Sequence, residues 1–121
     1  MVRNLIAIPL IFLISSSVFA AVPDCTGSER YPAKIAFTFL KNSGEVTNAE
    51  INFSKTAVTR LASERLSTDL FRQVHYITFF KKSGDSVSVI TVNDVSSEEC
   101  SMSQAKIYEV KARLDKETDK K

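Results

Sequence analysis

Residues 72–95 read RQVHYITFFKKSGDSVSVITVNDV, and two apolar runs joined by a short turn in this stretch decide the fold. The runs, Arg72–Lys82 and Ser86–Val95, are rich in β-branched and aromatic residues, which is typical of strands. Between them, residues 83–85 read Ser-Gly-Asp, which is turn chemistry. The stretch therefore predicts an antiparallel β-hairpin.

The turn leaves two registers open for this hairpin. A two-residue turn would pair Phe80 with Val87, whereas a glycine-bulge turn would pair Phe79 with Val87 and Ile77 with Val89. We prefer the glycine-bulge register, because it places apolar residues opposite apolar residues on both faces of the hairpin.

Upstream of the hairpin, residues 31–40 read YPAKIAFTFL, in which Ile35, Phe37 and Phe39 alternate with less apolar residues. This period of two predicts a strand. Residues 42–44 supply a turn, and the alternation in Val46–Phe53 predicts a second strand that returns beside the first.

A helix is predicted between these strands and the hairpin. Ser54 is a candidate N-cap, and Lys55–Leu66 follows it with one apolar stripe at helical spacing. The stripe consists of Val58, Leu61, Ala62 and Leu66.

Downstream, residues 96–103 are polar and predict a loop, and the alternation in Ala105–Leu114 predicts a last strand. Together these elements predict an α+β fold. It is an antiparallel sheet of about five strands, in the sequence order β-β-α-β-β-β, with one helix packed on one face.

Residues 1–20 have the pattern of a cleaved signal peptide: a basic start at Arg3, an apolar run, and small residues before a cleavage site after Ala20. An uncleaved membrane anchor is the alternative. We expect residues 21–114 to form a single globular domain, and residues 115–121 to form a polar C-terminal tail. The expected location is outside the cytoplasm: the periplasm if the source is bacterial, otherwise secreted, with no stable membrane insertion after cleavage.

The chain has two cysteines, Cys25 and Cys100. An even count in an exported chain predicts a disulfide, which would close most of the mature domain into one loop. Glu98 and Glu99 disfavour a catalytic or metal-binding role for Cys100, because their charge would raise the pKa of its thiol.

The remaining features weigh against chemistry at a cofactor or metal. His75 is the only histidine, and the sequence has no phosphate loop, dinucleotide fingerprint or calcium loop. We expect no cofactor and no metal. The alternative is a small secreted hydrolase that uses His75 with Asp94 and with Ser101 or Ser103.

The 121 residues carry a formal net charge of +2, to which the leader contributes Arg3. This near-neutral balance favours no nucleic-acid partner. If the helix covers one sheet face, the other remains as a candidate binding face. The residues assigned to that face are Val74, Tyr76, Phe80 and Val89.

The residues point to no known family. The expected function is that of a small exported, disulfide-bonded, non-enzymatic module that binds a protein partner, of the inhibitor, immunity or envelope accessory type. A surface structural or adhesive protein is a further alternative.

Overall fold

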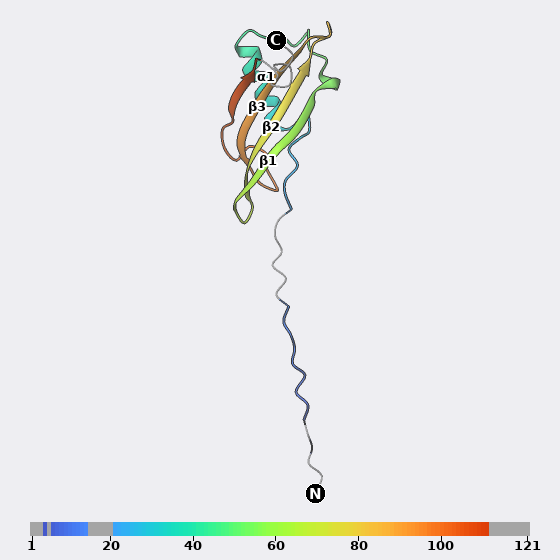
Figure 1. The fold of residues 1–121 in the computed structure, drawn as a ribbon, viewed down its shortest axis with the longest axis vertical. Coiled ribbons are helices and arrows are strands. Elements are labelled where there is room, and N and C mark those ends of the chain that lie inside the picture. The colour runs from blue at the N-terminus through green and yellow to red at the C-terminus, as the bar shows by residue number, and fades with distance from the viewer. Residues whose placement is uncertain (1–3, 5, 15–20, 112–121) are drawn as a thin grey trace, which may run out of the picture.

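The structure is a computed structural model, and it describes residue 4, residues 6–14 and residues 21–111. The elements run in the order α1 (Tyr31–Asn42), η1 (Phe53–Lys55), β1 (Ala57–Ser67), β2 (Leu70–Phe80), β3 (Ser86–Val95) and β4 (Lys106–Val110). The strands form one sheet in the order β1-β2-β3-β4, and every neighbouring pair is antiparallel. Figure 1 shows the sheet with α1 behind it.

The predicted α+β class with a helix on an antiparallel sheet is confirmed, but two details of it are wrong. The described sheet has four strands rather than five. The helix precedes all the strands instead of lying between the second and the third.

The central hairpin follows the prediction. β2 and β3 pair with Phe79 opposite Val87 and Ile77 opposite Val89, which is the glycine-bulge register. Gly84 adopts a φ of 101°, a left-handed conformation that only glycine adopts without strain. Turn chemistry and apolar matching therefore fix this register together.

The predicted strand at residues 31–40 is wrong, because these residues form α1. Pro32 lies at the start of the helix, where its fixed φ is favourable. Ala33, Ala36 and Leu40 are buried at helical spacing, and the small alanines let the backbone approach the sheet. Full burial of Leu40 contributes about 2 kcal/mol. Gly44, with a φ of 80°, ends the helix.

The predicted second strand at Val46–Phe53 is also wrong. In this segment a single β-bridge joins Ile51 to Lys81, and Asn52 donates a backbone hydrogen bond to the carbonyl of Phe80. Val46 and Ile51 are buried beneath α1. The apolar residues of this segment therefore contribute to the core from an irregular connection.

The helix predicted over Lys55–Leu66 is wrong, because most of this segment forms β1, an edge strand of 11 residues. Its supposed core stripe is mostly exposed: Leu61 is 56% and Leu66 39% exposed. A short turn at residues 68–69 folds β1 back onto β2, and the ladder of inter-strand hydrogen bonds overrides the helical preference of its side chains.

The predicted last strand is confirmed over Lys106–Val110, which form β4 and pair with β3, whereas Ala105 and Lys111 lie outside the strand. The rest of the predicted strand beyond residue 111, and the predicted tail at 115–121, lie outside the described residues.

The predicted cleavage site after Ala20 also lies outside the described residues, which resume at Ala21. Residues 6–14 have neither helix nor strand, and their apolar side chains are exposed. Among the described residues, no helix combines the length and the apolar character needed to cross a membrane.

The predicted disulfide between Cys25 and Cys100 is present, with a Cα–Cα distance of 5.8 Å. It joins the segment before α1 to the loop between β3 and β4. Cys25 is fully buried and packs with Phe71 and Val95 in a small apolar cluster. This cluster lies at the opposite end of the β2–β3 ladder from the larger core under α1.

Candidate functional site

Alternation along β2 and β3 gives the sheet two distinct faces. Ile77, Phe79 and Val89 pack against Ala36 and Leu40 of α1, so the odd-numbered residues of both strands form the core face. The even-numbered residues point to the other side, which we call the outer face. Where β2 and β3 pair, over residues 71–80 and 86–95, the outer face comprises Arg72, Val74, Tyr76, Thr78, Phe80, Ser86, Ser88, Ile90, Val92 and Asp94.

The centre of the outer face is an aromatic and aliphatic row across three strands. Tyr76 lies opposite Ile90, and Ile90 lies opposite Tyr108 of β4. Tyr76 and Ile90 are half-buried, and Tyr108 is 55% exposed. Beside this row, Val74 lies opposite Val92 and both are half-buried. The row therefore presents apolar and aromatic surface on a side of the sheet that α1 does not cover.

Three of the four residues predicted for the binding face lie on the outer face: Val74, Tyr76 and Phe80. The fourth, Val89, is a correction. It pairs with Ile77 on the core face and is 0% exposed, so it cannot contact a partner in the folded protein.

One end of the outer face is charged. Arg72 donates two hydrogen bonds to the Asp94 carboxylate, from Nε to Oδ1 at 2.9 Å and from Nη2 to Oδ2 at 3.3 Å. These hydrogen bonds raise the pKa of the Arg72 guanidinium, which stays charged. Arg72 and Asp94 line a hollow of about 310 Å³ together with Val92, Ser103 and Lys106.

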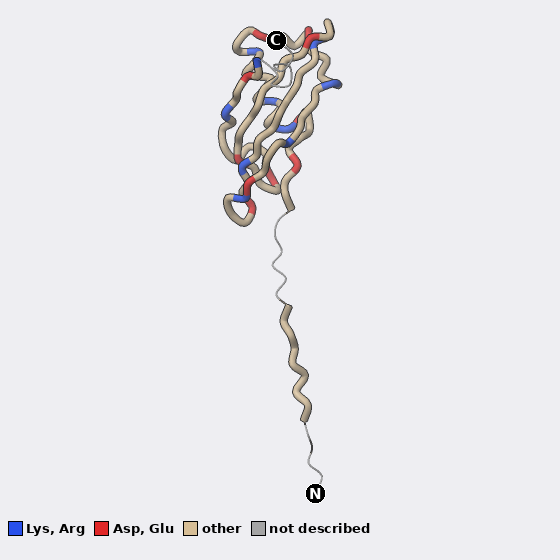
Figure 2. The backbone as a smooth tube through the Cα atoms, viewed as in Figure 1, with Lys and Arg blue, Asp and Glu red and all other residues tan. Residues whose placement is uncertain are grey.

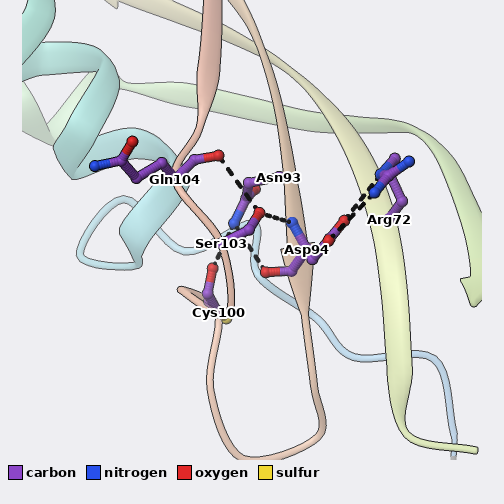
Figure 3. A network of polar contacts seen from close by, with 6 residues as sticks. All are labelled: Arg72, Asn93, Asp94, Cys100, Ser103 and Gln104. Carbon is purple, nitrogen blue, oxygen red and sulfur yellow. Dashed lines mark hydrogen bonds and ion pairs between the residues drawn. The ribbon is translucent and has the colours of Figure 1, made fainter. Parts of the chain in front are cut away.

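The loop after β3 is fixed at this end of the sheet (Figure 3). Ser103 Oγ accepts a hydrogen bond from the Asp94 backbone N–H at 2.8 Å, and Asn93 Nδ2 donates to the Cys100 carbonyl at 2.7 Å. The Cys25–Cys100 disulfide holds the same loop covalently. The charged end of the outer face is therefore pre-organised, which lowers the entropy cost of binding a partner there.

The loop is also tied to the β1–β2 turn. Asp69 accepts hydrogen bonds from the backbone N–H and the hydroxyl of Ser97, at 3.0 Å and 2.6 Å. These bonds lower the pKa of the Asp69 carboxyl below its usual range. Turn and loop are thus linked at the end of the sheet that also carries Arg72.

The structure does not assemble the triad of the hydrolase alternative. His75 is 0% exposed on the core face and lies opposite Thr91, whereas Asp94 lies on the outer face and is bound by Arg72. Ser103 donates its hydroxyl toward the Gln104 carbonyl. His75 and Asp94 therefore point to opposite sides of the sheet.

Sequence reasoning missed a buried polar band on the core face, between the two apolar clusters. Its members are Gln73, His75, Thr91 and Asn93, all at most 2% exposed. Gln73 Nε2 donates to the Pro23 carbonyl at 3.0 Å, which ties the segment before Cys25 to the sheet. Several side-chain atoms of the band have no hydrogen-bond partner among the described residues, and both ring nitrogens of His75 belong to this group.

Burial lowers the pKa of His75, and the charge of Arg60 adds to that effect, while Asp24 opposes it. The imidazole is therefore held neutral at neutral pH. A neutral, enclosed ring without access to solvent fits a structural role better than proton transfer to a substrate.

Charged residues of both signs are interspersed along the described chain, as Figure 2 shows. The tube has no continuous basic stripe in its described part, which agrees with the near-neutral net charge. Among these residues there is also no group of three or more histidine, cysteine, aspartate or glutamate side chains that could hold a metal ion.

Comparisons of the chain with protein-family models, with curated proteins and with solved structures find no match.

Proposed function

We propose that this protein is an exported, non-enzymatic module that binds a protein partner through the outer face of its sheet. The observation that carries the proposal is the row of Tyr76, Ile90 and Tyr108, which stays partly exposed while the opposite face is packed beneath α1. Tyrosine and arginine are the residue types that dominate binding energy at protein interfaces, and Arg72 lies at the end of the same face.

The rest of the outer face suits such a role. Its centre is apolar and its end carries the Arg72–Asp94 pair, which resembles the apolar core and polar rim of protein interfaces. The face is built on paired strands and on a loop closed by the disulfide. We place the protein in the periplasm if the source is bacterial, and otherwise outside the cell, with an inhibitor, immunity or envelope accessory role.

Affinity capture with matched surface variants tests the proposal. The oxidised protein, tagged at its C-terminus, is used to retain proteins from the native cell envelope, and the retained proteins are identified by mass spectrometry. We expect one dominant partner, and we expect Tyr108→Glu to lose it while the thermal unfolding midpoint stays unchanged. Phe39→Glu is the control and should retain the partner, because Phe39 is 39% exposed on α1 and so lies on the other side of the sheet. Equal retention by Tyr108→Glu would rule out the outer face as the binding surface.

A structural or adhesive role is the second candidate, because β1 and β4 form the edges of the described sheet. An edge strand offers unpaired backbone groups to another chain. Sedimentation velocity across a hundredfold concentration range separates the two roles. Assembly that grows with concentration would favour the structural role, whereas a monomer at every concentration would favour the binding module.

A further inference from the structure

A hollow of about 360 Å³ lies on the covered side of the sheet, between α1 and η1. Phe37 of α1, Phe53 of η1 and Phe79 of β2 line it. The rings of Phe37 and Phe53 meet edge to face with centroids 5.0 Å apart, and those of Phe37 and Phe79 lie 5.8 Å apart. The three rings form an aromatic wall in a space at the lower end of ligand pocket sizes, roughly 300–1,000 Å³.

Four polar residues line the same hollow, and two of them, Lys34 and Thr56, carry groups that a ligand could use. Lys34 is exposed, is the only charged residue among the lining residues, and has no ion pair within the described residues. The hydroxyl oxygen of Thr56 is buried and has no hydrogen-bond partner in the described part of the chain. A buried hydroxyl without a partner is costly, and a bound polar group would satisfy it.

The lining also explains why the hollow is open. Phe53 is 45% exposed although it is a large aromatic residue, because η1 is a single short turn in which no residue is buried. Ala33 is small, so α1 leaves space next to Lys34 where a larger residue would fill it. An apolar body could therefore rest on Phe37 and Phe53 with its polar end at Lys34.

We propose that the hollow between α1 and η1 binds a small amphipathic anion, an aromatic or short alkyl carboxylate. The apolar body packs against the three phenylalanine rings, and the carboxylate lies at Lys34. This site goes beyond the proposed function, because it lies on the opposite side of the sheet from Tyr76 and Tyr108.

The probe for the test is 4-phenylbutyrate, and its amide is the neutral control. Titration of the ¹⁵N-labelled protein, followed by amide chemical shifts, should give saturable changes at residues lining the hollow. A ligand of this size is expected to bind with a dissociation constant of about 1 mM. The amide should bind more weakly than the acid, because it lacks the charge that Lys34 attracts.

Three variants sharpen the test. Lys34→Gln should weaken binding of the acid by about two- to fivefold and leave the amide unchanged, since an exposed ion pair contributes little more. Lys55→Gln, which removes the same positive charge in η1 but outside the lining, is the matched control and should not alter the binding of either ligand. Phe53→Ala should weaken both ligands by about tenfold, and its thermal midpoint reports whether the fold is kept.

The proposal is overturned by three results: no saturation up to 10-fold above the expected constant, shifts confined to the outer face, or equal loss of acid and amide in Lys34→Gln. None of these results would bear on the partner-capture experiment, which compares a change on the outer face with a change outside both the outer face and the hollow.

Discussion

Removal of the Cys25–Cys100 disulfide should cost this protein a large share of its stability. The bridge joins residues 75 positions apart, so it constrains most of the described chain. The perturbation is the double substitution Cys25→Ala with Cys100→Ala, which avoids leaving a free thiol.

The size of the effect follows from loop closure. For a loop of this length the chain-entropy relation gives about 4.5 kcal/mol at 25 °C, through restriction of the unfolded state. Truncating the fully buried Cys25 beside Phe71 and Val95 adds a small cavity cost. Domains of this size have a free energy of unfolding of about 5–15 kcal/mol, so the loss is a third or more of the total. The midpoint of thermal unfolding should fall by roughly 20–35 °C.

Urea unfolding followed by circular dichroism measures the loss. The oxidised protein, the double variant and the chemically reduced protein are compared, and the last two should agree within about 1 kcal/mol. The denaturant m-value should rise when the bridge is absent, because the unfolded chain then exposes more surface. A loss below about 2 kcal/mol with an unchanged m-value would refute the loop-closure reasoning.

Three further measurements test the described faces and turns. Val89→Asp should abolish cooperative unfolding, because Val89 lies on the core face, whereas Ile90→Asp on the outer face should lower the free energy of unfolding by under about 2 kcal/mol. Similar losses of stability in the two variants, measured by circular dichroism, would contradict the assignment of the faces. As pH falls below the usual His75 pKa of 6.5, the unfolded state gains a proton that the buried ring resists, so stability should fall by up to about 1.4 kcal/mol per pH unit. His75→Leu should remove this slope in urea titrations at several pH values, and an unaltered slope would assign it to another group. Gly44→Ala and Gly84→Ala should each cost about 1 kcal/mol, since both glycines have positive φ and space for a Cβ; no change in the unfolding midpoint would argue against these turns.

The β2–β3 hairpin and the disulfide were predictable because each depends on a local or countable signal. A Ser-Gly-Asp turn between two β-rich runs admits few registers, and apolar matching selects one of them. Two cysteines allow a single intramolecular pairing. Neither inference needed to know what the rest of the chain does.

The exchange of helix and strand upstream has a physical reason in each segment. Residues 31–42 fit both the period of two of a strand and the spacing of a helix, and the predicted strand depended on the alternation at Phe37 and Phe39. The helical reading, with Ala33, Ala36 and Leu40 buried, prevails because Pro32 and Gly44 mark the ends of a helix. Those end signals were present in the sequence and outweigh a short alternation.

Segment β1 could not be recognised from its own residues. Leu61, Ala62 and Leu66 suit a helix, and little of the strand is buried. Its conformation comes from pairing with β2, with nine paired positions from Ala57–Thr78 to Ser67–Leu70. An exposed edge strand carries little hydrophobic pattern, so propensity alone gives the wrong element.

The prediction that Val89 lies on the binding face is wrong because it does not follow the alternation of side chains along β3. In the glycine-bulge register Val89 lies opposite Ile77, so it cannot share a face with Tyr76. A shift of one position along a strand places a side chain on the opposite face of the sheet. The face that α1 covers then decides which residues of β2 and β3 are buried in the core and which lie on the outer face.

The burial of polar and apolar residues in β2 and β3 is inverted near the middle of the sheet. Polar side chains such as Gln73 and His75 are buried on the core face, while their apolar neighbours Val74 and Tyr76 are only half-buried on the outer face. The same inversion recurs across the ladder in residues 90–93 of β3. A sequence that only had to fold would reverse this order, because burying unpaired polar atoms and exposing apolar surface both oppose stability. Departures of this kind concentrate where a protein serves a purpose other than its own stability, and here they converge on the strands that carry the outer face.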